Sequence, residues 1–100
     1  MAAVSDLPTI RLVGLHKKNI RKLLDEYGDG NYYGGSARLI IDRIPPDAVY
    51  VECNGYRIGR LPKRYNQVIV PSLRDVNKVK AYVGTVEDSA DLFAEIDVFK

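Results

Sequence analysis

Hydrophobic and polar residues alternate along residues 9–15 (TIRLVGL), where Ile10 and Leu12 fall on one side. This period of two predicts a first strand. The period lengthens in residues 17–27, whose apolar positions have helical spacing and predict one amphipathic helix: Ile20, Leu23, Leu24 and Tyr27. A Gly-Asp-Gly sequence ends this helix, and the following NYYGGS, residues 31–36, is expected to form a loop.

The second half of the chain contains short apolar runs separated by residues that favour turns. These runs predict five more strands, at residues 37–44, 48–53, 56–61, 78–86 and 92–99. Residues 63–76 predict one or two helical turns followed by a loop. The expected order is β-α-β-β-β-(short helix)-β-β. We therefore expect a mainly β fold with one amphipathic helix, a small antiparallel barrel of the OB or SH3 kind.

The dipeptide Asn54-Gly55 is the strongest turn signal in the chain, because a two-residue type I′ turn requires φ > 0 at both central positions. A hairpin with this turn makes Glu52 face Arg57 as a cross-strand pair of opposite charge. The same register places Tyr50 over Gly59, where the missing side chain leaves room for its ring.

Strict alternation after Ile58 would direct Arg60 into the core and Leu61 outward. A buried arginine without a partner is very costly. We therefore expect a β-bulge at Gly59, which shifts the alternation by one residue, so that Leu61 points inward and Arg60 outward. Pro62 then ends the strand by removing a hydrogen-bond donor.

The chain has 100 residues, which is the size of one domain with its own core. We expect residues 1–8 to be a flexible lead-in and residues 9–100 to form the single domain. No apolar run has the roughly 18 residues of a membrane span, so no membrane association is expected. Cys53 is the only cysteine, which excludes an internal disulfide and favours an intracellular setting.

Positive charge is concentrated in two stretches that contain no acid, while five acids lie within residues 87–97. The basic residues are Arg11, Lys17, Lys18, Arg21 and Lys22 in the first stretch, and Arg57, Arg60, Lys63 and Arg64 in the second. A basic face of this kind suits an anionic partner, although a charge run can also be a solvated surface.

The hairpin register brings Asp47 next to Arg60 and Lys63, because position 47 faces position 62. The first predicted strand ends at His16, which Lys17 and Lys18 follow. If that end meets the same rim of the barrel, the carboxylate of Asp47 and the imidazole of His16 lie together with several cations, including Arg64. The other interpretation is an ion-pair cluster in which Asp47 caps a turn.

Enzyme chemistry is not expected. The chain has one histidine and one cysteine, and Cys53 belongs to the inner face of the hairpin, where it packs as a small hydrophobe. His16 and Asp47 are a possible acid–base pair, but no nucleophile accompanies them. GDGNYYGG lacks the strand before it and the helix after it that a nucleotide-binding loop requires, and no metal-ligand spacing occurs, so no cofactor is expected.

The run IIDRIPPDAVYVECNGYRIGRLPKR, residues 40–64, resembles the signature of the HIRAN domain family. The specific part is residues 44–63, and the general resemblance covers residues 10–99. It implies a small β-barrel that holds the 3′ end of single-stranded DNA through an aromatic stack, a turn aspartate (here Asp47) near the 3′-hydroxyl and basic groups on the phosphates. HIRAN domains occur fused to DNA-remodelling helicases and alone in bacteria and phages, so the resemblance implies a role in DNA repair or replication and a larger DNA-processing protein as a possible partner.

The sequence departs from the family pattern at the residues that stack on bases. The family's aromatic or histidine after the Ile-Gly pair is Arg60 here, and the aromatic pair after the first strand is Lys17-Lys18. Tyr32 and Tyr33 are candidate replacement rings, or alternatively packing residues.

The expected function is therefore binding of single-stranded DNA at or near a free 3′ end. The candidate binding residues are Asp47, Arg60, Lys63, Arg64, His16, Lys17, Lys18, Tyr32 and Tyr33. The alternative is a protein–protein interaction module that uses the same barrel without binding nucleic acid. The sequence leaves the oligomeric state open.

Overall fold

The computed structural model describes residues 9–42, 48–72, 78–86 and 91–99. Its elements follow the predicted order: β1 (Ile10–Arg11), α1 (Lys17–Tyr27), β2 (Tyr32–Asp42), β3 (Ala48–Cys53), β4 (Tyr56–Arg60), α2 (Lys63–Ser72), β5 (Lys78–Thr85) and β6 (Leu92–Phe99). The fold is mainly β, which confirms the predicted class. Asp47 lies outside the described residues.

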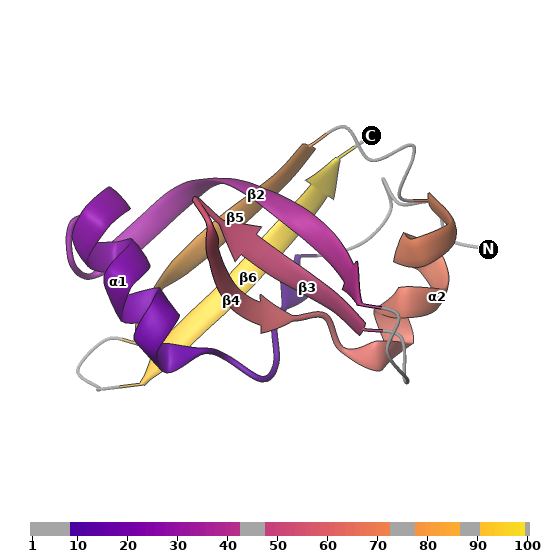
Figure 1. Ribbon diagram of the computed structural model, residues 1–100, viewed down its shortest axis with the longest axis horizontal. Coiled ribbons are helices and arrows are strands. Elements are labelled where there is room, and N and C mark those ends of the chain that lie inside the picture. Colours follow the sequence, from indigo (N-terminus) through magenta and orange to yellow (C-terminus); the bar gives the residue numbers. More distant parts are fainter. Residues whose placement is uncertain (1–8, 43–47, 73–77, 87–90, 100) are drawn as a thin grey trace.

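The strands form one curled antiparallel sheet in the order β1-β6-β5-β2-β3-β4. The long strand β2 causes the curl, because its first part (residues 32–37) pairs with β5 and its second part (residues 38–42) pairs with β3. Figure 1 shows β2 arching from one group of strands to the other. The result is a half-barrel, consistent with the small barrel expected.

The segment after β1 joins the two edges of this sheet. The N–H of Leu12 donates to the carbonyl of Ala94 in β6 at 2.9 Å. One residue later the chain reaches β4, where Val13 and Arg60 exchange two backbone hydrogen bonds of 2.9 and 3.0 Å. We call this contact the seam. The predicted strand over residues 9–15 is therefore wrong in length, because the chain leaves β6 after Arg11 to close the barrel against β4.

The predicted hairpin is present, and its turn has φ +50° at Asn54 and +88° at Gly55, as a type I′ turn requires. Glu52 faces Arg57 as predicted. The bulge falls one residue earlier than expected, at Ile58, so that Val51 faces Gly59.

Gly59 has a different role from the one predicted. A Cβ there would lie 3.1 Å from Leu15 Cδ2 and 3.2 Å from the carbonyl oxygen of Val13, so its missing side chain admits the seam rather than the ring of Tyr50. The expected consequence of the bulge nevertheless holds: Leu61 is buried and Arg60 is exposed.

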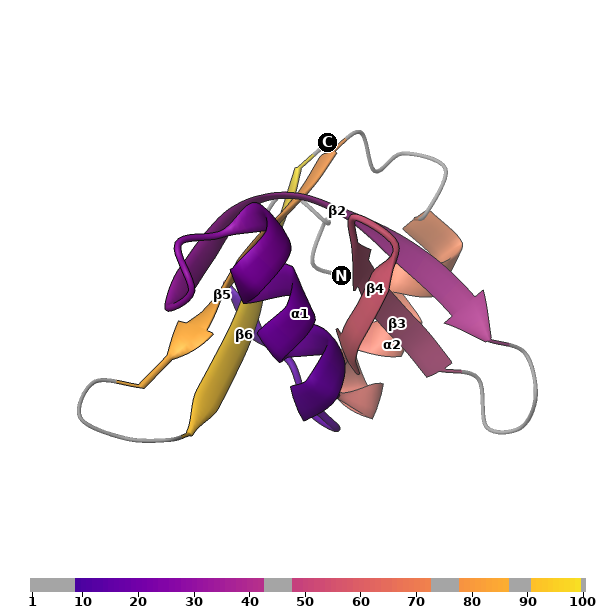
Figure 2. The same ribbon diagram turned by 60° about the vertical axis from the view of Figure 1, so that its left-hand side comes forward.

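The two helices lie at the two ends of the curled sheet (Figure 1). In Figure 2, α1 lies between the β5–β6 side and the β3–β4 side, and it contacts β2, β4 and β5. It buries Ile20, Leu23 and Leu24 completely, as the helical spacing predicts, whereas Tyr27, the fourth apolar position, is 54% exposed. At the other end α2 contacts β3 and buries Ile69. With ten residues, α2 is longer than the one or two turns expected.

The expected loop at residues 31–36 is wrong, because β2 begins at Tyr32. Pairing with β5 holds this segment extended despite its two glycines. The tyrosines fill the space that the glycines leave: a Cβ on Gly34 would lie 3.1 Å from the hydroxyl of Tyr32, and one on Gly35 would lie 2.8 Å from the hydroxyl of Tyr33. Within the described part of the chain, neither helix is long and apolar enough to cross a membrane.

Candidate nucleic-acid interface

Strand β4 presents two arginines on the outside of the sheet. Arg57 and Arg60 are both exposed, and their cross-strand partners are Glu52 and Tyr50. The bulge at Ile58 places two residues between the arginines while both still face outward.

Arg57 stacks on a tyrosine instead of forming an ion pair. Its guanidinium carbon lies 4.1 Å from the centroid of the Tyr50 ring, a cation–π contact across the hairpin. Arg57 and Glu52 face each other in register, but no salt bridge joins them among the residues described. Sequence reasoning missed Tyr50 as a site residue; the signal was its diagonal position to Arg57 in the predicted register.

The side chain of Arg60 lies over Gly14. An added Cβ on Gly14 would lie 2.3 Å from Arg60 Nη1, so the guanidinium occupies the place of the missing side chain. Gly14 has φ +58°, in the left-handed region that favours glycine. The sharp backbone turn at Gly14 therefore also forms the surface against which the guanidinium of Arg60 lies.

Two hydrogen bonds join the beginning of α1 to β4. The backbone N–H of His16 donates to the carbonyl of Ile58 at 2.9 Å, and Asn19 Nδ2 donates to the carbonyl of Arg57 at 2.9 Å. His16 also caps the helix, because its Nδ1 accepts the backbone N–H of Asn19 at 3.2 Å.

Both helices begin with exposed lysine or arginine residues. Lys17 and Lys18 start α1, and Lys63 and Arg64 start α2 immediately after Leu61-Pro62. Neither first turn contains an acidic residue. Cations at a helix N-terminus oppose the positive end of the helix dipole, so this arrangement does not contribute to helix stability.

We call the exposed groups along β4 and at the two helix starts the basic rim: His16, Lys17, Lys18, Arg57, Arg60, Lys63 and Arg64. Over the described ranges no salt bridge neutralises any of them, and the ion pair found there joins Arg11 to Glu95. Arg64 makes a cation–π contact with Tyr65, its guanidinium carbon 4.8 Å from the ring centroid. The structure thus brings the backbone of His16 to β4, the strand that carries Arg60. Lys17 and Lys18 follow His16 in α1, and Lys63 and Arg64 follow β4 in α2.

The two candidate tyrosines of β2 have different environments. Tyr33 is only 7% exposed, and its hydroxyl donates to the carbonyl of Ser36 at 3.1 Å and accepts from Asn54 Nδ2 at 3.1 Å. It has no free ring face for a base, so its assignment as a binding residue is corrected in favour of packing. Tyr32 is 45% exposed but pairs with Gly84 of β5, away from β4. The structure does not bring it to the basic rim.

Other reactive groups offer little chemistry. Cys53 is fully buried, and this burial, with a smaller contribution from the charge of Glu52, raises the pKa of its thiol to about 12. Such a thiol is a poor nucleophile near neutral pH. Among the residues that the structure describes, no group of three or more His, Cys, Asp or Glu side chains is placed to hold a metal ion.

Comparison of the chain with models of protein families, with curated proteins and with solved structures finds no match.

Proposed function

We propose that this protein is a binding module for single-stranded nucleic acid, most specifically single-stranded DNA, and that the basic rim is its binding surface. The observation that carries the proposal is the set of unneutralised cations at the starts of both helices and along β4. Their position opposes the helix dipoles, so an anionic ligand accounts for them better than stability does. A polyanion bound along β4 contacts the basic side chains of the rim over the whole length of the strand.

The rim also contains a surface suited to a base. The stacked pair of Tyr50 and Arg57 combines an aromatic ring with a planar guanidinium. Stacking on such groups contributes about 1–3 kcal/mol per base in single-strand binding, whatever the sequence. Arg57 and Tyr50 thus take the place, in this proposal, of the aromatic groups that the HIRAN resemblance implies.

The test is a fluorescence-polarisation titration with labelled random single-stranded oligonucleotides. The variant Arg60→Ala/Lys63→Ala removes two rim cations. We expect weaker binding and a slope of log K against log salt that is flatter by about 1.4, since each lost phosphate contact on a single strand accounts for about 0.7.

The matched control is Arg11→Ala/Lys22→Ala, which removes the same charge away from β4 and from the start of α2; Arg11 is already paired with Glu95. Equal losses in both double variants would show a general effect of net charge and would contradict a site at the rim. If the wild type binds no oligonucleotide at all, the rim is a protein-docking surface and the proposal fails.

End recognition rests on Asp47 and on the HIRAN resemblance. Simple electrostatics predicts that Asp47→Ala binds every single strand equally or more tightly, because a negative charge is removed from the protein. If Asp47 accepts a hydrogen bond from the terminal hydroxyl, the variant instead binds strands with a free 3′-hydroxyl more weakly, by about 1.5–3 kcal/mol. Matched 3′-phosphorylated strands should show little change, and tighter binding of both strands would exclude end capture.

A further inference from the structure

A second surface with aromatic and basic side chains lies on the outer side of β2 and β5. The register pairs Tyr32 with Gly84, Gly34 with Tyr82, and Ser36 with Lys80. The alternate residues of β5, Val79, Ala81 and Val83, are buried, so this set points away from the core. We call it the sheet face: Tyr32, Gly34, Ser36, Lys78, Lys80 and Tyr82.

The sheet face has room for a flat ligand. A hollow of about 500 Å³ is lined by residues 34–37 of β2 and residues 78–80 of β5. A second hollow of about 310 Å³ shares Ser36 and Ala37 with it and extends to Arg38, Glu52 and the Asn54-Gly55 turn. Both volumes are in the range of small-ligand sites. The ring of Tyr32, which is 45% exposed, lies over Gly34, so an aromatic surface borders the first hollow.

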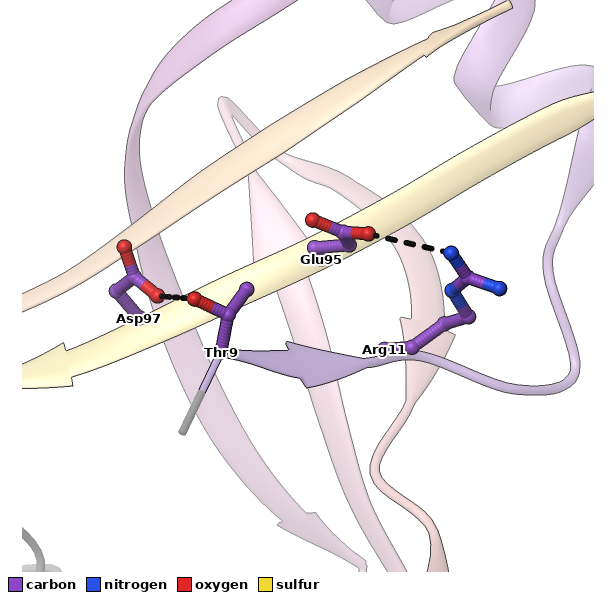
Figure 3. A network of polar contacts seen from close by, with 4 residues as sticks. All are labelled: Thr9, Arg11, Glu95 and Asp97. Atoms are coloured by element: carbon purple, nitrogen blue, oxygen red, sulfur yellow. Dashed lines mark hydrogen bonds and ion pairs between the residues drawn. The ribbon is translucent and has the colours of Figure 1, made fainter. Parts of the chain in front are cut away.

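The cations of this face form no salt bridge with the neighbouring acids among the described residues. Asp97 is the direct cross-strand partner of Lys80, and Glu95 that of Tyr82. Figure 3 shows that both carboxylates instead reach the other way, to β1: Asp97 accepts from the hydroxyl of Thr9 at 2.5 Å, and Glu95 lies 3.6 Å from Arg11.

As a result, Lys80 has no acidic partner in the described ranges, and neither does Lys78. The ammonium of Lys80 lies 5.8 Å from the Tyr82 ring centroid. An aromatic ring flanked by unpaired cations beside an open hollow suits a base linked to a phosphate.

We propose that the sheet face is a second binding surface for single-stranded nucleic acid, which takes a nucleotide with its base on Tyr32 or Tyr82 and its phosphate at Lys78 and Lys80. Since the seam joins β1 to β4, β5 lies three strands from β4 in either direction around the barrel. Two strands, β2 and β3, therefore separate the β5 residues of the sheet face from β4. One molecule can hold two separate strands, or two distant parts of one strand.

This surface is tested independently of the rim by working in two backgrounds, the wild type and Arg60→Ala/Lys63→Ala. In each background, binding of a labelled oligothymidylate is compared for Tyr32→Leu, for Tyr32→Phe, which keeps the ring, and for Lys78→Gln/Lys80→Gln. We expect at least about a fivefold loss of affinity with Tyr32→Leu and no loss with Tyr32→Phe. The lysine pair should flatten the salt slope by about 1.4. Circular dichroism verifies that each variant is folded.

The second readout is energy transfer between donor-labelled and acceptor-labelled non-complementary oligonucleotides, with the protein shown to be monomeric by light scattering. We expect transfer with the wild type and its loss when either surface is altered. If the sheet-face variants bind like their parents in both backgrounds, the second surface is excluded, while the rim proposal stands or falls on its own variants. If only the sheet-face variants lose binding, the rim proposal fails and the inference stands.

Discussion

Gly14 links the closure of the barrel to the basic rim, so its replacement by alanine tests both. The residue has φ +58°, and the left-handed conformation costs a non-glycine residue about 1–2 kcal/mol. Alanine also reduces the conformational entropy of the unfolded chain, which stabilises the folded protein by about 0.4–1 kcal/mol and offsets part of this cost. The expected net loss of stability with Gly14→Ala is about 1 kcal/mol, or roughly 4–8 °C in Tm for a domain of this size.

The new methyl group has a second effect, on Arg60. It would lie 2.3 Å from Arg60 Nη1, which is closer than any normal contact. Since that atom is the far end of a flexible, exposed side chain, the guanidinium moves away at little cost in stability. Binding through the rim should then lose one phosphate contact, and the salt slope should flatten by about 0.7.

Urea denaturation followed by far-ultraviolet circular dichroism measures the first effect, and the oligonucleotide titration measures the second. Gly30→Ala is a matched control, because Gly30 has φ +92° but no atom within 4 Å of an added Cβ. It should lose stability without any change in the salt slope. The binding effect of Gly14→Ala should also disappear in an Arg60→Ala background.

Two results would refute this reasoning. A stability loss well below 0.5 kcal/mol in Gly14→Ala would mean that the seam does not hold Gly14 in the left-handed conformation. An equal loss of binding in the Arg60→Ala background would mean that the methyl group does not act through Arg60.

Three further predictions concern the rest of the fold. Tyr33→Phe should lower the free energy of unfolding by about 1 kcal/mol, because the carbonyl of Ser36 loses its donor; an unchanged urea midpoint would contradict this. Cys53, with a thiol pKa of about 12, should react with iodoacetamide at pH 8 only on unfolding, so mass spectrometry should find native protein unmodified and protein in urea alkylated. Two backbone N–H groups hold the pKa of Asp29 below its usual 3.8, so its contribution to stability is present above about pH 4 and is lost as the pH falls through the folded-state pKa. The Tm difference between wild type and Asp29→Ala should accordingly shrink in acid, and a difference that does not depend on pH would be evidence against the carboxylate's role.

Local signals predicted the hairpin and α1 well. The Asn54-Gly55 turn determines a register by its own geometry, and the cost of burying Arg60 was enough to require a bulge. Helical spacing identified Ile20, Leu23 and Leu24 as core residues. In each case the deciding interaction lies within one element or between neighbours in the chain.

The wrong predictions depend on contacts between distant segments. The position of the bulge, at Ile58 rather than Gly59, follows from the approach of Val13, which no local pattern reveals. The glycine-rich start of β2 is a strand because β5, far along the chain, pairs with it. Period and propensity alone favour a loop there.

The same distinction between local signals and contacts of distant segments applies to the candidate site. Its cations could be identified from sequence, because charge runs are visible without a fold. The Tyr50–Arg57 stack could be predicted only from the hairpin register, and the burial of Tyr33 only from its contact with Asn54. The separation of Tyr32 from the rim could be predicted only from the order of strands in the sheet.

The seam also has a consequence for the order of events during translation. Ile10 pairs with Ile96, so the first strand can pair with β6 only after the 85 residues between them have been synthesised, which takes roughly 4–17 s at ordinary ribosomal rates. Until then the barrel cannot close on both sides. Before Val13 pairs with Arg60, β4 offers an unpaired edge to other nascent chains, and charged side chains on an edge strand discourage such pairing. The exposed Arg57 and Arg60 place charge on this edge, so we expect them to disfavour its pairing with a second nascent chain.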